Sequence, residues 1–300
     1  PQLHRNPVAH PEAPADGLNA TWKKSPLPIN LSVKKQPMAS QVLAVSPENH
    51  GQKSWRAASN YQFASTVPMG SVVLSELGKV ASIFPMVLVE RQGGFELVAL
   101  FGLQNGQNLF VDPQGRWMAR YIPARLRAYP FSLAFREGLP DPLLCVDESS
   151  GLVGEVGDGE PFFETSGKLA PQLQSFVNFL GALEKERRAT ATAIEAIVKL
   201  QLLKPLKIKG AALDPADQSS SDFTGLHAID ESRLQALDAA DLAALRDQRG
   251  LSLAYAQLLS LYQLESLDLL LHLRRQRQTS AEAPASPQDL TPASDVFRFS

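Results

Sequence analysis

The chain has 300 residues, of which 44% are hydrophobic and 20% are charged, and its formal net charge at pH 7 is -2. This composition is typical of a globular protein that is long enough for one large core or two smaller ones. A nearly neutral chain argues against a nucleic-acid-binding protein, because such proteins need basic surface to neutralise phosphates. The single cysteine, Cys145, excludes an internal disulfide and a cysteine-rich metal site.

The two ends of the chain differ in composition from its middle. Residues 1–38 contain seven prolines and few aliphatic side chains, which predicts a proline-rich extended arm. Residues 279–300 are rich in Ser, Ala and Pro, which predicts a flexible tail. No stretch near the N-terminus has the apolar centre of a secretory signal. The predicted location is therefore the cytoplasm, with association with the cell envelope as the alternative.

Residues 39–167 show the patterns of short strands and tight turns. The predicted strands are 41–45, 61–64, 85–90, 95–103, 130–135 and 143–147. A further short strand is predicted at 108–111, between the turn signals Asn105-Gly106 and Asp112-Pro113-Gln114-Gly115. Helical spacing occurs in two stretches, 71–84 and 122–129. Short antiparallel strands of this kind favour a twisted sheet or a small barrel.

From residue 168 to residue 278 the apolar residues recur mainly every three or four positions, as they do on one face of a helix. The predicted elements are one or two helices over 171–203 that end before Pro205, two paired strands at 206–213 and 223–229, and short helices at 231–237 and 239–246, with Asp230 and Asp238 as N-caps. A leucine-rich segment at 251–273 also contains acidic residues and glutamines, so we interpret it as a buried helix and predict no transmembrane span. Three basic residues lie near the C-terminal end of this predicted helix, where the negative end of the helix dipole favours them: Arg274, Arg275 and Arg277.

No proline- or glycine-rich linker separates the β-rich and helical halves near residues 165–170. We therefore predict a single α+β domain over residues 39–278, in which both halves share one core.

The chain contains none of the local spacings that usually mark a catalytic, metal or nucleotide site. Its five histidines form no HxD, HxxxH or HExxH pattern, and neither phosphate-loop motif nor a GxSxG elbow is present. Cys145 and His227 are interpreted as structural residues, and Asp147-Glu148 as part of a solvated loop. No catalytic residue, metal ligand or cofactor is predicted.

Aromatic and arginine side chains are concentrated in residues 116–131. Such mixtures are common in binding hot spots, where arginines also stack on aromatic rings. The predicted binding residues are Trp117, Arg120, Tyr121, Arg125, Arg127 and Tyr129. The alternative interpretation is that the aromatic residues belong to the core and that the arginines surround it.

Five separated stretches carry a resemblance to a known family. In chain order they read VASIFPMVLVE, LVALFGLQNGQNLFVDPQGRWMARYIPARLRAYPF, LLCVDESSG, a glycine- and acid-rich run ending EPFFE, and LSLAYAQLLSLYQLESL. Together they resemble the SapC family of bacterial proteins from about Ala44 to about Leu273. The most specific part is GQNLFVDPQGRW followed by YIPARLRAYPF. The sequence of residues 50–65 agrees less well with the family pattern. The arm and the tail lie outside the part of the chain that resembles the family.

The resemblance implies little about chemistry. The family name suggests a link to bacterial surface layers, and members occur in Gram-negative bacteria, often beside genes for outer-membrane receptors and flavin-dependent halogenase-like proteins. No catalytic residue set comes with the family.

Three functions therefore stay open. The first is a non-enzymatic binding or accessory protein that recognises a peptide, a protein or an envelope component through residues 117–131, with homo-oligomerisation through the arm or the tail. The second is an enzyme, or the partner subunit of a halogenase-like enzyme, acting on a peptide or an amino-acid side chain. Its candidate groups are His227, Asp230, Asp147, Glu148 and Arg120. The third is a structural surface-layer component.

Overall fold

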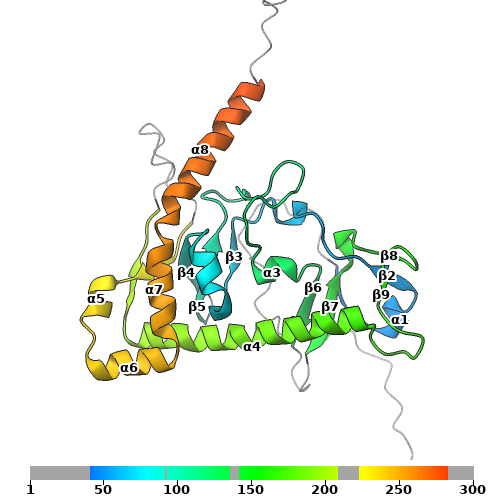
Figure 1. Cartoon of the computed structure of the whole chain (residues 1–300), viewed down its shortest axis with the longest axis horizontal. Coiled ribbons are helices and arrows are strands. Elements are labelled where there is room, and N and C mark those ends of the chain that lie inside the picture. Colours follow the sequence, from blue (N-terminus) through cyan, green and yellow to red (C-terminus); the bar gives the residue numbers. More distant parts are fainter. Residues whose placement is uncertain (1–40, 92, 136–141, 209–222, 283–300) are drawn as a thin grey trace, which may run out of the picture.

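The computed structural model describes residues 41–91, 93–135, 142–208 and 223–282, and for 278–282 it describes the backbone alone. The predicted arm and most of the predicted tail lie outside these residues. In the described residues, the fold is α+β as predicted, with strands mainly in the N-terminal half and long helices in the C-terminal half. Figure 1 shows three sheets side by side above one long helix, α4 (Pro171–Lys199).

The largest sheet has five antiparallel strands in the order β10-β11-β4-β5-β3. Their bounds are β3 Met69–Ser71, β4 Met86–Arg91, β5 Gly94–Leu100, β10 Leu203–Pro205 and β11 Leu226–Ile229. The predicted β4–β5 hairpin is confirmed, and Gly93 adopts a positive φ of 95° in its turn. Strand β11 pairs with β10, which lies a few residues earlier than the predicted partner strand.

Two smaller antiparallel sheets lie along the N-terminal half of α4 (Figure 1). One contains β1 (Val42–Ala44), β7 (Leu143–Asp147) and β6 (Phe131–Ala134), all three of which were predicted as strands. The other contains β8 (Val153–Glu155), β2 (Lys53–Trp55) and β9 (Glu160–Pro161). The glycine-rich stretch that contributes β8 shows no β pattern in the sequence, so the pattern did not predict this sheet.

The helices of the C-terminal half largely agree with the predictions. Helix α4 is one continuous helix, and it ends at Lys199, before the predicted stop at Pro205. The remaining helices are α5 (Glu231–Gln235), α6 (Ala239–Asp247), α7 (Gly250–Ser260) and α8 (Gln263–Glu282). Asp230 and Asp238 are confirmed as N-caps, since their side chains accept backbone N–H groups of the first turns.

The predicted helix at 251–273 is instead two helices. The backbone N–H groups of Leu261 and Tyr262 bond three residues back, to Leu258 and Leu259, and this tighter turn separates α7 from α8. Helix α8 then continues to Glu282, beyond the predicted boundary at 278. Arg274 therefore lies inside a helix rather than at its end.

Two predicted strands are wrong, because asparagine side chains bond the backbone there in place of a neighbouring strand. Residues 62–64 form a 3-10 helix, and Asn60 Oδ1 accepts the N–H of Gln62 at 2.6 Å just before it. In the predicted strand 108–111, the buried Asn108 donates to the Ala64 carbonyl and accepts the Phe110 N–H. Only Val111 forms a β-bridge there, with Trp117.

The predicted helix at 71–84 is also shorter than expected. Ser71 ends strand β3, a 3-10 turn follows at Leu74–Glu76, and the helix α2 covers only Leu77–Ala81. The predicted turns at 122–129 are confirmed as α3 (Ala124–Arg127).

Buried apolar side chains join the two halves of the chain. The largest cluster extends from Ala64 to Leu271 and includes residues of β4, β5, α4, α7 and α8. A second cluster, with Trp55, Phe131 and Phe162, packs on the N-terminal half of α4. Helix α4 thus contributes to both cores.

The buried His50, in α1 (Pro47–His50), predicts a pH dependence of stability. Its side chain is fully buried, Nδ1 accepts the Ser46 N–H at 3.3 Å, and Nε2 lies 3.4 Å from Glu148, which also contacts Lys53. Burial lowers the pKa of His50 below its ordinary value, the charge of Glu148 partly opposes this, and Lys53 adds to it.

The unfolded chain therefore binds more protons than the folded chain once the pH approaches about 6.5, the ordinary histidine pKa. We expect the contribution of the neutral, buried His50 to the free energy of unfolding to be fully present above about pH 7 and to be lost progressively as the pH falls below that value. In His50→Gln this decline should be shallower. Urea unfolding at several pH values measures both slopes, and equal slopes would contradict the prediction.

Candidate functional site

The main pocket lies between α4, strands β3 and β5, and the short helix α3, and it encloses about 250 Å³. Its apolar lining comes from Val72, Val73, Phe95, Leu97, Leu133, Phe135, Leu180, Leu183, Ala191 and Ile194. Its charged lining comes from Arg91, Glu96, Arg125, Glu184 and Arg187. The pocket therefore combines an apolar wall with a small charged group.

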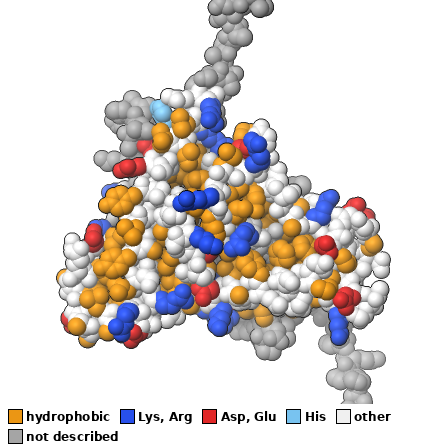
Figure 2. Space-filling view, viewed as in Figure 1, with side chains coloured by type: hydrophobic (Ala, Val, Ile, Leu, Met, Phe, Trp, Pro, Cys, Tyr) orange, Lys and Arg blue, Asp and Glu red, His pale blue; other side chains and the backbone are white. Residues whose placement is uncertain are grey.

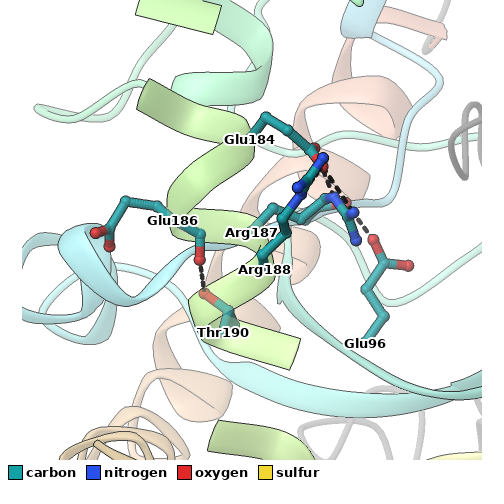
Figure 3. A network of polar contacts seen from close by, with 7 residues as sticks. Glu96, Glu184, Glu186, Arg187, Arg188 and Thr190 are labelled. Atoms are coloured by element: carbon teal, nitrogen blue, oxygen red, sulfur yellow. Dashed lines mark hydrogen bonds and ion pairs between the residues drawn. The ribbon is translucent and has the colours of Figure 1, made fainter. Parts of the chain in front are cut away.

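Helical spacing explains the contribution of α4. Leu180, Leu183, Glu184, Arg187, Thr190, Ala191 and Ile194 are separated by one, three or four residues, and together they form one face of the helix. Thr190 also fixes the neighbouring chain, since its hydroxyl accepts the Leu74 N–H at 3.0 Å and donates to the Glu186 carbonyl at 2.7 Å. Figure 3 shows this helix face and its polar contacts.

Both carboxylates of the pocket already have cationic partners. Glu184 accepts two hydrogen bonds from Arg187, at 2.7 and 2.8 Å, and one from Arg188 at 3.0 Å. Burial tends to raise the pKa of Glu184, but these hydrogen bonds outweigh burial and hold the pKa below its ordinary value. Figure 3 shows Arg187 between Glu184 and Glu96, and the charge of Glu96 also favours its protonated form.

Two further residues, Ser71 and Arg91, contact the carboxylate of Glu96. It accepts a hydrogen bond from Ser71 of β3, and Arg91 Nε lies 3.5 Å from its second oxygen. Neither Glu96 nor Glu184 is therefore an unpaired anion in the pocket.

Arg125 is the exception among the charged residues of the pocket. Its side chain is half-buried and, within the part of the chain that the structure describes, its guanidinium makes no hydrogen bond or ion pair. Burial lowers the pKa of Arg125, the charges of Glu96 and Glu184 oppose this, and Arg187 adds to it. An arginine still keeps its charge at neutral pH, so its donors face the pocket without a fixed acceptor.

Two of the other predicted binding residues are half-buried and pack against other aromatic rings. Trp117 donates its Nε1–H to the Tyr121 carbonyl at 2.8 Å, and its ring contacts those of Phe84, Phe101 and Phe110. Tyr129 stacks on Phe63 with ring centroids 3.9 Å apart. Burial, followed by the charge of Asp147, raises the pKa of Tyr129 to about 12. These contacts match the alternative interpretation of the cluster, aromatic residues in the core.

Tyr121 and Arg127 form a second group. The Tyr121 hydroxyl donates to the buried Glu76 at 2.8 Å, and burial together with this bond raises the pKa of Tyr121 to about 12. The Arg127 guanidinium lies 5.8 Å from the Tyr121 ring centre and 5.3 Å from that of Phe179. Arg127 is the last residue of α3 and Tyr121 lies three residues before its start, so these contacts hold α3 in place beside the pocket.

Arg120 lies on the surface and lines a different hollow. This shallow second hollow encloses about 240 Å³ and is lined by Lys79, Ser82, Ile83, Arg120 and Tyr121. Figure 2 shows Lys and Arg side chains gathered near the middle of this face of the molecule. The structure thus divides the predicted binding residues, and only Arg125 lines the main pocket.

The groups proposed for an enzyme are not brought together. His227 lies on β11, with Nδ1 3.2 Å from the Gly225 carbonyl, and Asp230 caps α5. Asp147 ends β7 and caps the 3-10 turn that follows, and Glu148, the first residue of that turn, contacts His50 and Lys53. None of these four residues lines the main pocket or the second hollow.

Cys145 is buried in β7, and burial raises the pKa of its thiol. Among the described residues, no three His, Cys, Asp or Glu side chains gather in a way that could hold a metal ion. In the same residues, no helix combines the length and the hydropathy that crossing a bilayer requires.

The sequence analysis missed Glu96, Glu184 and Arg187 as pocket residues. A signal was present for two of them: Glu184 and Arg187 interrupt the apolar face that Leu180, Leu183 and Ile194 define on α4. Charged residues on a buried face need partners, and so they mark a polar site inside the packing. For Glu96 we find no local signal.

The fold and the pocket together define a class: an α+β protein with an arginine-containing apolar pocket between a long helix and a sheet. The chain belongs to the SapC family, whose model matches residues 45–267, which confirms the resemblance. This span contains every residue that lines the pocket. No curated protein and no solved structure matches the chain.

Proposed function

We propose that the chain is a non-enzymatic binding protein that holds the C-terminal carboxylate and the last apolar side chain of a peptide in the main pocket. The observation that carries the proposal is Arg125, a half-buried cation that has no acceptor among the described residues of the chain. A guanidinium binds a carboxylate through two parallel hydrogen bonds, and such charge-assisted pairs are among the strongest in proteins.

The charges around Arg125 support an anionic ligand. Three arginines and two glutamates line the pocket, which leaves one positive charge. Both glutamates are engaged by other arginines, so a ligand carboxylate would not have to displace an existing ion pair. A ligand with one negative charge would bring the net charge of these five side chains to zero.

The size and the lining of the pocket support a chain end rather than a large ligand. About 250 Å³ is slightly below the range of roughly 300–1,000 Å³ that is usual for small-molecule sites. Leucines from α4 and β6, together with Ile194, provide an apolar wall that suits one aliphatic or aromatic side chain. A terminal residue presents such a side chain beside its carboxylate.

A binding role also agrees with the chemistry of the lining. The hydroxyl of Thr190 is engaged by two backbone groups, and the carboxylates are paired with arginines. No observation in the pocket favours the alternative of an enzyme acting on a peptide or an amino-acid side chain.

The proposal is tested by titration calorimetry with two pools of short N-acetylated peptides that end in Val, Leu, Ile or Phe. One pool has free C-terminal carboxylates and the other has C-terminal amides. We expect the free acids to bind at least 10-fold more tightly, because a hydrogen-bonded charge contributes about 1.5–3 kcal/mol and 1.4 kcal/mol is a factor of ten.

Variants locate the interaction. We expect Arg125→Gln to weaken binding of the free acids by at least 10-fold, and Arg246→Gln, an exposed arginine on α6, to leave it unchanged. Equal binding of acids and amides, or no binding of either pool, would contradict the proposal. A loss in Arg120→Gln instead of Arg125→Gln would place the ligand in the second hollow and would also contradict it.

A further inference from the structure

Helices α7 and α8 expose a regular line of apolar side chains. The line consists of Tyr255, Leu259, Tyr262, Leu269 and Leu273, whose exposed fractions are 47, 63, 74, 50 and 41%. With the small Ser266 between Tyr262 and Leu269, the spacing is four, three, four, three and four residues. This is the spacing of a coiled-coil seam. We name this line of six residues the α7–α8 stripe.

The stripe is not the face with which these helices pack on their own chain. Leu253, Leu267 and Leu271 are buried on the other side, and Arg274 Nη1 donates to the Asn108 carbonyl at 2.8 Å. In Figure 1, α8 continues beyond the body of the molecule, and Figure 2 shows hydrophobic side chains over α7 and the first turns of α8. The helices therefore have a second apolar face that their own chain leaves exposed.

The exposed area of the stripe is sufficient for an interface. At these fractions the five apolar side chains expose roughly 500 Å² together, which is at the upper end for a patch on a monomer. Covering the stripe on two copies would bury about 1,000 Å² in all, the lower limit for a specific interface.

The stripe is complementary to itself when two copies run antiparallel. In that alignment the small Ser266 of one copy faces Leu269 of the other, and Tyr262 faces Leu273, so large residues meet small or slender ones. A two-fold axis then lies between positions 266 and 269, as an isologous dimer requires.

Charges beside the stripe favour the same direction. In the antiparallel alignment, Glu265 of one copy lies next to His272 of the other. In a parallel alignment, His272 would instead lie next to Arg277, where a protonated His272 would face a second cation. From the spacing, the area and these charges, we propose that a second copy of this chain covers the α7–α8 stripe in an antiparallel two-fold dimer.

Sedimentation of the full chain over a wide concentration range tests the dimer. We expect the wild-type chain to dimerise and Leu259→Glu and Leu269→Glu to weaken the dimer by at least 100-fold, because each replaces an apolar side chain of the covered stripe by a carboxylate in both copies. Both residues are exposed in the single chain and glutamate is a good helix former, so the variants keep the fold. Met118→Glu, at a residue that is 62% exposed outside the stripe, is the matched control and should dimerise normally.

The direction is tested with nitroxide labels on Arg277→Cys in a Cys145→Ala background. At 1.5 Å per residue, the antiparallel dimer places the two labels about 30 Å apart, whereas a parallel one places them about 10 Å apart. A monomeric wild-type chain, a dimer that both glutamate variants leave intact, or the short distance would each overturn the proposal. Because no residue of the stripe lines the main pocket, these results do not depend on peptide binding.

Discussion

Replacing Gln257 with leucine is expected to lower the free energy of unfolding by about 3 kcal/mol, since each buried polar group that loses its partner costs about 1–3 kcal/mol. Gln257 is fully buried in α7, where its Nε2–H donates to the Met86 carbonyl and its Oε1 accepts the Ile229 N–H, both at 3.0 Å. The substitution removes both bonds and keeps the apolar bulk. Ser260, one turn later, accepts the Met86 N–H at 2.9 Å.

These bonds attach α7 to the largest sheet. At Met86, where β4 begins, the backbone N–H and the carbonyl are both bonded by α7 rather than by another strand. Urea unfolding measures the loss in Gln257→Leu. The control is Gln172→Leu on the exposed side of α4, which should change stability by less than about 0.5 kcal/mol. A Gln257→Leu variant as stable as the control would contradict this account.

Replacing Glu76 with glutamine is expected to change both the stability and the titration of Tyr121. The Glu76 side chain is 4% exposed, and it accepts hydrogen bonds from the Tyr121 hydroxyl at 2.8 Å, the Ala124 N–H at 2.7 Å and the Val73 N–H at 3.4 Å. One carboxylate thus joins the end of β3, the Trp117–Tyr121 segment and the start of α3. Glutamine loses the charge and turns part of this acceptor into a donor, which we expect to cost about 2 kcal/mol.

The pKa of Tyr121 reports on this carboxylate directly. Burial raises it first, and then the hydrogen bond and the charge of Glu76 bring it to about 12. In Glu76→Gln we expect the pKa to fall part of the way towards the ordinary value of about 10, because burial still raises it and Arg127 still lowers it, but both contributions of Glu76 are lost. NMR of chains labelled at the tyrosine ring measures it.

Tyr129, with a pKa of about 12 that does not depend on Glu76, is the internal control in the same spectra. Glu195→Gln, on the exposed face of α4, is the matched carboxylate control. An unchanged Tyr121 pKa in Glu76→Gln would mean that Glu76 does not hold the hydroxyl as the structure has it.

The elements that the sequence predicted correctly are those that depend on local chemistry. The β4–β5 hairpin follows from a glycine turn between two apolar runs, and α5 and α6 follow from their aspartate caps. The two wrongly predicted strands have another cause, because the short side chains of Asn60 and Asn108 bond the backbone two residues later in place of a strand ladder. Alternating apolar residues do not reveal such bonds.

The candidate site was predicted only in part, for a physical reason. Arg125 belonged to the predicted binding residues because arginines and aromatic rings are dense around it. Which of those residues face a pocket depends on partners far along the chain. Trp117 is half-buried and packs on Phe84 and Phe101, whereas α4 forms the far wall beside Arg125.

The most direct test of the central claim follows a peptide into the pocket itself. Chains labelled at the methyl groups of Leu, Val and Ile are titrated with a free-acid peptide ending in leucine and observed by NMR. We expect the methyl signals of Leu133, Leu183 and Ile194, which line the pocket, to shift in a saturable way in the wild-type chain and to respond only weakly in Arg125→Gln. If these signals stay in place while that of Ile83 in the second hollow moves, the pocket beside Arg125 is not the binding site.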